Sequence, residues 1–130
     1  MLNDIVSDFL SRVRNSLIVK KKSVRVFYSK FVYNILCIIL ENGYINSFDK
    51  IKENNVFYLI IYLKYDSKGN SLIDGIIRVS KPSVRIYYDY KKVKKTKEKG
   101  ILILSTNKGV ISNLIALEKK IGGEVVCKIW

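Results

Sequence analysis

Segment 100–130 constrains the fold of this 130-residue chain more than any other stretch, because short apolar runs alternate there with turn residues. The apolar run 101–104 is bounded by turn residues, which is typical of a buried strand. Aliphatic residues recur at helical spacing over 110–117 and predict a short helix. From residue 124 onward apolar and polar residues alternate, which indicates a half-buried strand. The segment therefore predicts a strand, a turn, a helix, a second turn and a final strand.

The first turn of this segment, Ser105-Thr106-Asn107-Lys108-Gly109, is expected to lie at the N-terminus of that helix. Thr106 or Asn107 would cap the helix with a side-chain oxygen. The free N–H groups and the positive end of the helix dipole would then favour an anion such as phosphate. Gly122-Gly123 would end the helix, because glycine adopts positive φ at little cost and permits a close backbone approach. Turn and capping rules alone, in an ordinary strand–helix–strand unit, account for most of the same pattern.

The rest of the chain predicts an α+β protein of two small domains. Residues 1–66 are expected to form an N-terminal α/β domain, in which a three-stranded sheet carries two helices. Its predicted helices are 3–16 and 30–42, the second capped by Ser29, and its predicted strands are 23–28, 45–51 and 56–65. A polar, glycine-containing linker follows at 66–70. Residues 67–130 are expected to form a C-terminal, mostly β domain with one short helix.

Net charge indicates the kind of partner. The chain has 24 Lys and Arg against 11 Asp and Glu, a net charge of +13, which predicts a polyanionic partner and salt-sensitive binding. By charge alone the partner could be RNA, DNA or an anionic membrane surface. The longest uncharged apolar run, 31–40, is shorter than the roughly 20 residues that cross a bilayer, and Asp4 and Asp8 interrupt any signal-peptide pattern. We therefore expect a soluble protein that is not exported.

Catalysis and cofactor binding have little support in the sequence. The chain contains no histidine, and its cysteines, Cys37 and Cys127, are too far apart for a CxxC pair, so we expect both to be buried and reduced. Phosphate-loop, dinucleotide and zinc-hydrolase motifs are absent from the sequence. Ser105 lacks a histidine partner, although a Ser-Lys dyad with Lys108 remains formally open. We expect no enzyme activity, no metal, no cofactor and no small-molecule substrate.

Aromatic residues beside a lysine run favour RNA among the polyanions. Tyr87, Tyr88 and Tyr90 precede the run 91–99, which has six lysines and one glutamate. Aromatic rings stack on unpaired bases or sugars, while lysines bind phosphates. Alternatively, some of these tyrosines belong to a sheet core and the lysines form a solvated loop, because half of the side chains of a strand normally face inward.

Segment 100–130 resembles the signature of the bacterial-type small ribosomal subunit protein eight, a family that binds ribosomal RNA directly. The matching positions are Gly100, Ile103, Leu104, Ser105, Thr106, Gly109, Val110, Ile111 and Ala116, followed by Gly122, Gly123, Glu124 and Cys127. Further positions match in order along nearly the whole chain: Asp8, Leu10, Arg12, Arg14 and Asn15; Ser29 and Lys30; Gly43, Tyr44 and Ile45; residues 78–82 and 85–87. The sequence departs from the family pattern at Asp4, Ser83 and Asn107, where the family has proline, glycine and often serine.

This resemblance implies a structural constituent of the ribosome that binds the central domain of small-subunit ribosomal RNA and helps subunit assembly, next to other ribosomal proteins. It implies that the C-terminal turn reads the RNA through Ser105, Thr106 and Asn107, with Lys108 beside them and Gly122, Gly123 and Glu124 lining the same groove. Flanking phosphate and sugar would be held by Lys30, Arg78, Lys81, Arg85 and Tyr87, and Arg12 and Arg14 would contact phosphate unless they only form a solvated helix face.

Other functions and locations remain open at this level. A nonspecific RNA chaperone or another basic polyanion-binding protein would have the same charge, whereas a membrane-surface protein would need an apolar helix face that both small cores require. We expect neither membrane binding nor a homo-oligomer. A composition that is rich in Lys, Asn, Ile and Tyr, with one Pro, suggests an AT-rich genome. It predicts a ribosome in a mitochondrion, with a plastid or the bacterial cytoplasm as alternatives.

Overall fold

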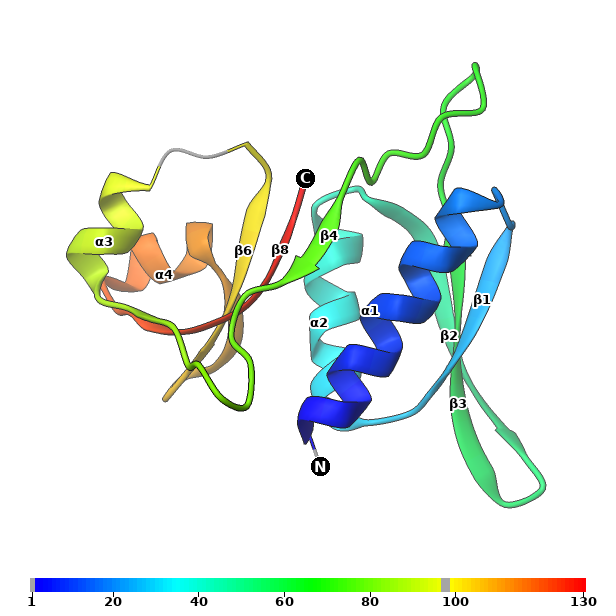
Figure 1. Cartoon of the computed structure of the whole chain (residues 1–130), viewed down its shortest axis with the longest axis horizontal. Helices are drawn as coiled ribbons and strands as arrows, with labels where there is room; N and C mark the ends of the chain where they lie inside the picture. Colours follow the sequence, from blue (N-terminus) through cyan, green and yellow to red (C-terminus); the bar gives the residue numbers. More distant parts are fainter. Residues whose placement is uncertain (1, 97–98) are drawn as a thin grey trace. The chain divides into compact units, whose positions relative to one another are not determined.

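The computed structural model of the protein describes residues 2–96 and 99–130, with side chains from residue 5 onward. The chain divides into two compact units, Met1–Asp74 and Gly75–Trp130 (Figure 1). The sequence placed the domain boundary at residues 66 and 67. The loop after that point closes within the first unit, because the backbone N–H of Asp66 donates to the carbonyl of Asn70 at 2.8 Å and Tyr65 pairs with Ser71.

The first unit is a three-stranded antiparallel sheet with two helices on one face (Figure 1). The strands are β1 (Ser23–Phe27), β2 (Ile45–Glu53) and β3 (Val56–Leu63), in the order β1-β3-β2, and the helices are α1 (Leu2–Ile18) and α2 (Lys30–Glu41). Alternation along β3 turns Leu59 and Ile61 into the core, where helix residues such as Phe9 and Ile35 are also fully buried. The predicted sheet and both predicted helices are confirmed.

Short-range signals in the sequence set the ends of these elements. The side-chain oxygen of Ser29 accepts a hydrogen bond from the backbone N–H of Val32 at 3.0 Å, so the predicted cap of α2 is confirmed. Asn54 and Asn55 have φ of +52° and +64°, the conformation of a two-residue hairpin turn, and asparagine tolerates it better than most residues. The β2–β3 hairpin is therefore specified locally.

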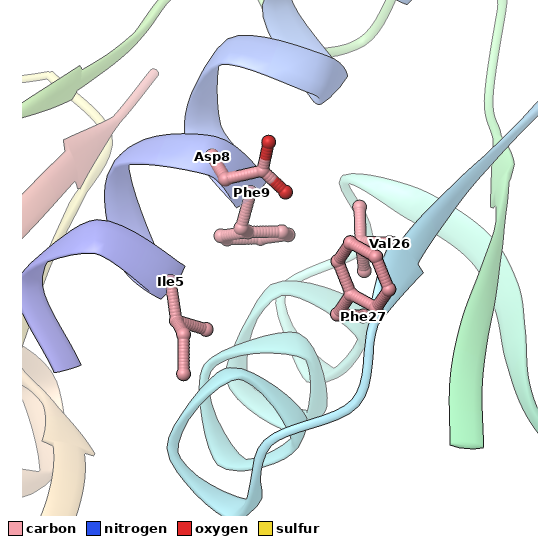
Figure 2. Close-up of a pocket in the computed structure, with 5 residues that line it drawn as sticks. All are labelled: Ile5, Asp8, Phe9, Val26 and Phe27. Atoms are coloured by element: carbon pink, nitrogen blue, oxygen red, sulfur yellow. The ribbon is translucent and has the colours of Figure 1, made fainter. Parts of the chain in front are cut away.

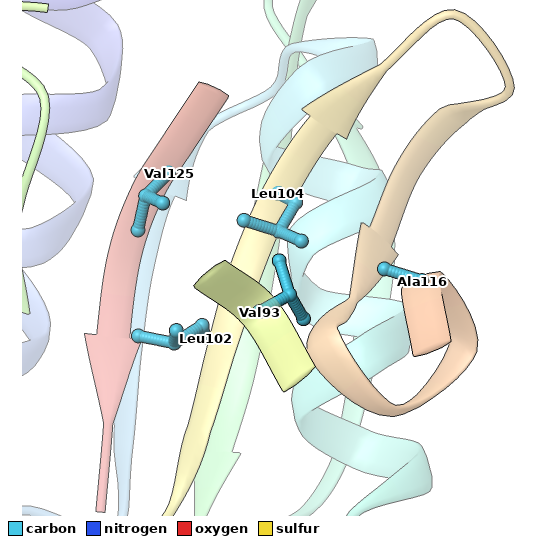
Figure 3. Packing of buried hydrophobic residues seen from close by; sticks show 5 residues of the cluster. All are labelled: Val93, Leu102, Leu104, Ala116 and Val125. Atoms are coloured by element: carbon cyan, nitrogen blue, oxygen red, sulfur yellow. The ribbon is translucent and has the colours of Figure 1, made fainter. Parts of the chain in front are cut away.

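The second unit is a five-stranded antiparallel sheet with two short helices. Its elements are β4 (Ile76–Arg78), β5 (Tyr87–Tyr88), α3 (Tyr90–Lys95), β6 (Ile101–Thr106), β7 (Gly109–Ser112), α4 (Asn113–Lys119) and β8 (Gly123–Ile129). The main strand order is β4-β8-β6-β7, and β5 also pairs with β8. Figure 3 shows a core in which strands and helices both contribute, formed by Val93, Leu102, Leu104, Ala116 and Val125.

The predicted short helix after turn 105–109 is found as α4, but its predicted start directly after the turn is wrong. β6 and β7 form a hairpin, in which Val110 pairs with Ser105 and Ile111 with Leu104, and α4 begins at Asn113. The side-chain oxygen of Ser112 caps α4 by accepting from the backbone N–H of Ile115 at 3.3 Å. Short apolar runs suit strand and helix alike, and here pairing with β6 decides between them. The turn therefore does not lie at a helix N-terminus, and the phosphate site predicted from the helix dipole does not follow.

Gly122 and Gly123 do not cap α4 either. The helix ends at Lys119, and its C-cap is Lys120, whose φ is +55°. The glycines instead permit a close approach of strands: a Cβ on Gly123 would lie 2.5 Å from the carbonyl oxygen of Ser105, and one on Gly122 would overlap the carbonyl oxygen of Tyr88. Of the two roles that the sequence suggested for them, only the close approach is found.

The lysine run contains a helix that the sequence did not predict. The side chain of Asp89 caps α3 by accepting from the backbone N–H of Lys92 at 2.8 Å, and Val93 anchors the helix in the core. Residues 97 and 98 of the run lie outside the described residues.

The two cysteines differ in environment. Cys127 is fully buried as expected, and burial raises the pKa of its thiol to about 12. Cys37 is only half-buried; partial burial and the charge of Glu41 raise the pKa of its thiol. Among the described residues, none of the helices is both long and apolar enough to cross a membrane.

The start of α4 can be tested through its cap. Ser112→Ala should lower the free energy of unfolding of the second unit by about 1 kcal/mol, because the N–H of Ile115 loses its acceptor. Asn107→Ala, at the hairpin tip, should change it by less than about 0.5 kcal/mol. Urea unfolding followed through the fluorescence of Trp130, the single tryptophan, measures both. A larger loss for Asn107→Ala than for Ser112→Ala would contradict this helix start.

Candidate nucleic-acid interface

Strand pairing brings together residues from three distant parts of the sequence at one end of the second sheet. On β8, Glu124 lies directly opposite Tyr87 of β5 on one side and Ser105 of β6 on the other. Directly opposed residues share a face of the sheet, and the neighbouring pair Leu104 and Val125 faces the core. Ser105, Glu124 and Tyr87 therefore lie in one row on the face away from that core.

The β6–β7 turn contains two kinds of polar side chain. The hydroxyl of Thr106 accepts from the backbone N–H of Lys108 at 3.0 Å and donates to the carbonyl of Gly109 at 2.9 Å, so it is used by the turn itself. The side chains of Ser105 and Asn107 make no hydrogen bond to any other described residue. Asn107 and Lys108 are exposed and Ser105 is half-buried. Two of the predicted RNA-reading side chains are thus available to a ligand, and the third shapes the turn.

Glu124 is paired with an arginine. Its carboxylate accepts from the Arg85 guanidinium at 2.9 Å, and the side chain of Glu124 is 18% exposed against 46% for Arg85. The hydrogen bond and the charge of Glu124 raise the pKa of Arg85 above its usual value. The pair holds the guanidinium beside the row that contains Ser105, where it can still bind a phosphate from the solvent side.

A buried serine shapes the loop between β4 and β5. The Ser80 hydroxyl accepts from the backbone N–H of Ile86 at 2.9 Å and donates to its carbonyl at 3.2 Å. The carbonyl of Ser80 accepts from the guanidinium of Arg78 at 2.7 Å. Lys81 and Val84 pair across the predicted turn. The side chains of Lys81 and Arg85 are both exposed. The family-like positions 78–82 did not predict this role of Ser80, because its hydroxyl acts on a residue six positions away.

Tyr87 and Tyr88 separate into the two roles that the sequence left open. Tyr87 is 69% exposed, in the row described above. Tyr88 packs against the core, and its ring lies 5.1 Å from the Lys92 ammonium. Tyr87 can therefore stack on a base or sugar, whereas Tyr88 mainly supports the sheet.

The three remaining predicted contacts, Arg12, Arg14 and Lys30, are exposed residues of the first unit. The Arg12 guanidinium pairs with Asp8 at 2.9 Å and lies 5.8 Å from the Phe27 ring centroid. Arg12 also lines a polar cleft of about 450 Å³ between α1 and β1, together with Asn15, Ser16, Lys21, Ser23, Val24 and Arg25. Sequence reasoning missed Lys21 and Arg25 as partners of Arg12, because only the fold brings β1 beside α1.

A smaller cleft of about 220 Å³ lies at the other end of the same helix–strand pair. Figure 2 shows its lining by Ile5, Asp8, Phe9, Val26 and Phe27, which is apolar except for the carboxylate of Asp8. Among the described residues, no group of three or more His, Cys, Asp or Glu side chains is placed to hold a metal ion.

Comparison with known proteins identifies the family of the chain. The family Ribosomal protein S8 matches residues 4–130 of the chain. The chain belongs to this family. It is 40% identical to small ribosomal subunit protein uS8 of Nautilia profundicola and of Campylobacter lari, and 39% identical to that of Campylobacter jejuni, over the full length of both chains in each case. S8 proteins are structural ribosomal proteins and not enzymes, and they bind ribosomal RNA. The chain is thus a structural constituent of the small ribosomal subunit.

The different roles of Thr106 and Ser105 in the β6–β7 turn can be tested by measuring stability alone. Thr106→Ala should lower the free energy of unfolding of the second unit by about 1 kcal/mol, because the turn loses an acceptor and a donor. Ser105→Ala should change it by less than about 0.5 kcal/mol. Equilibrium unfolding in urea compares the two variants, and equal losses would show that Ser105 also has a structural role.

Proposed function

We propose that the chain binds the central domain of small-subunit ribosomal RNA chiefly through the β6–β7 turn and the adjoining start of β8. The observation that supports this most strongly is the row of Ser105, Glu124 and Tyr87, with the uncommitted side chain of Asn107 at the tip of the turn. These groups would form the specific part of the contact and would help the RNA to fold during subunit assembly.

Short polar side chains suit the readout of an irregular RNA helix. Ser105 and Asn107 can donate and accept hydrogen bonds without a long side chain, so the protein backbone can approach splayed bases closely. Gly122 and Gly123 add no side chain where β8 begins, because a Cβ there would meet the carbonyl oxygens of Tyr88 and Ser105. Base edges and 2′-OH groups would therefore meet the hydroxyl of Ser105, the amide of Asn107 and the carboxylate of Glu124.

Cations around this row would supply the nonspecific part of the affinity. The exposed cations of this unit, Arg85, Lys81 and Lys108, would bind phosphates. Arg78, whose guanidinium donates to the carbonyl of Ser80, would add to them. Tyr87 would stack on a base or sugar. In the first unit, Lys30, Arg12 and Arg14 would bind further phosphates. The cleft that contains Arg12 adds Lys21 and Arg25 to that set.

The relatives also bear on where this ribosome works. The similar proteins named above come from bacteria, and these favour the bacterial cytoplasm over the mitochondrion that the composition suggested. We therefore propose a bacterial small subunit, in which the chain also contacts neighbouring ribosomal proteins.

The proposed reader can be tested with a double variant. Ser105→Ala combined with Asn107→Ala should weaken binding to the central-domain RNA fragment by about 2 to 4 kcal/mol, at about 1 to 2 kcal/mol for each lost hydrogen bond to the RNA. Filter binding or calorimetry at fixed salt measures the change, and unfolding in urea shows whether the fold is intact.

Lys95→Ala is the matched control, because it removes an exposed charge on α3 without touching the row. It should weaken binding far less and mainly reduce the dependence of affinity on salt. A double variant that binds as tightly as the parent, or no more weakly than Lys95→Ala, would overturn the assignment of the reader.

A further inference from the structure

Four aromatic residues of the first unit gather beside α2, outside the site proposed above. Tyr33 comes from α2, Phe48 from β2 and Phe57 from β3, and Tyr28 directly follows β1. The backbone N–H of Tyr28 donates to the carbonyl of Phe57 at 3.1 Å, which extends the sheet and brings the two rings together. Segments far apart in sequence thus build one aromatic surface.

The rings form a continuous chain of contacts. The ring centroids of Tyr33 and Phe48 are 5.3 Å apart in an edge-to-face arrangement. Those of Tyr28 and Phe57 are 6.2 Å apart, and Tyr28 lies 6.3 Å from Tyr33. Tyr33 is 37% exposed and Phe57 43% exposed, so the cluster is at the surface and not part of the core.

Lysines are set among these rings. The Lys50 ammonium lies 4.0 Å from the ring centroid of Tyr28 and 4.6 Å from that of Phe57. The Lys52 ammonium lies 5.5 Å from the Phe57 ring. Phe48, Lys50 and Lys52 alternate along β2, so they share one face of that strand. The rings hold two lysine ammonium groups at the surface, where each can still bind an anion.

A groove adjoins the cluster. It has a volume of about 470 Å³ and is lined by Tyr33, Cys37, Leu40, Glu41, Phe48, Asp49 and Lys50, which combine apolar and polar groups. A planar group that enters it meets the rings of Tyr33 and Phe48. The carboxylates of Asp49 and Glu41 can accept hydrogen bonds from amino or hydroxyl groups of that ligand.

We propose that this α2–β2 groove binds an unpaired nucleotide of single-stranded RNA. The base stacks on Tyr33 or Phe48, and its phosphate pairs with Lys50 or Lys52, the combination that single-strand binding sites use. The groove is lined by charged groups, namely the ammonium of Lys50 and the carboxylates of Glu41 and Asp49. This favours a polar, hydrogen-bonding occupant over an apolar protein surface, which would strip water from these groups without replacing it. The proposal rests on the proposed function, because ribosomal RNA would supply the single strand. The groove would be a second RNA contact, in addition to the β6–β7 turn.

One matched pair of double variants tests the groove in the full-length chain. The groove variant is Tyr33→Leu with Lys50→Ala. The control is Tyr62→Leu with Lys68→Ala, because Tyr62 is 36% exposed on β3, opposite Ser23 and Ser47 and outside the cluster, and Lys68 is an exposed lysine of the same unit. Thermal unfolding verifies that both variants fold.

The first probe is a fluorescent adenosine hexamer, with binding followed by anisotropy at low salt. The groove variant should bind it about tenfold more weakly than the parent, since one stacked base and one charge contact are lost, whereas the control should stay within about twofold. Equal losses in both variants would show nonspecific charge binding and overturn the proposal.

The second probe is a hexamer of 5-iodouridine crosslinked to the unmodified chain by light, which avoids any dependence on variant folding. Mass spectrometry should find the adduct on Tyr33 or Phe48. Adducts confined to the second unit, or none in the first, would overturn the groove assignment.

Failure of this inference can be told from failure of the proposed function. The groove variant should retain specific binding to the central-domain fragment, which Ser105→Ala with Asn107→Ala should lose. If the fragment binds specifically while the hexamer shows no groove-dependent binding, only the second site is wrong. If the fragment itself binds no better than an unrelated RNA, the proposed function is wrong irrespective of the groove.

Discussion

The close approach of β8 to the ends of β5 and β6 is the constraint on which the second unit depends. β8 pairs with β4, β5 and β6, so three segments of the unit are held through one strand. At its start, Gly122 and Gly123 face the carbonyl oxygens of Tyr88 and Ser105 at distances that leave no room for a Cβ. Any side chain there would push the strands apart and separate Tyr87, Glu124 and Ser105, which now form one row. The close packing at Gly122 and Gly123 therefore also maintains the proposed binding surface.

In the proposed RNA-binding surface, polar side chains that hydrogen-bond within the protein lie close to polar side chains that make no such bond. The hydroxyls of Thr106 and Ser80 hydrogen-bond to backbone groups, and the carboxylate of Glu124 forms an ion pair with Arg85. Because these groups fix the turn and the preceding loop, the side chains of Ser105 and Asn107 are presented without side-chain hydrogen bonds to the rest of the described chain. A rigid turn loses little conformational freedom on binding, so more of each hydrogen bond to RNA appears as affinity.

The sequence predicted the first unit better than the second, for a physical reason. Ser29 and the Asn54-Asn55 turn act over a few residues, and α2 has a wide apolar face, so local rules suffice. In the second unit the run 110–117 suited helix and strand alike, and pairing with β6 decided that Val110 and Ile111 are in a strand. The cap by Asp89 was a local signal that sequence reasoning overlooked amid the lysines.

The candidate site was predicted as a set of residues through family resemblance and not through geometry. Sequence could not show that Glu124 pairs with Arg85, that Thr106 serves the turn or that Lys21 and Arg25 join Arg12, because each of these contacts is made only by the fold. The aromatic cluster at Tyr28, Tyr33, Phe48 and Phe57 could not be predicted for the same reason, since its rings come from three elements and the residue that follows β1.

The most direct test of the central claim is the salt dependence of RNA binding by the unmodified chain. Affinity for the central-domain fragment of its small-subunit RNA is compared with affinity for an unrelated hairpin of equal length across a salt series. A specific reader adds hydrogen bonds that salt does not screen, so we predict that preference for the cognate fragment persists at high salt. Equal affinities that fall together as salt rises would contradict the account and leave only a basic fold that binds polyanions.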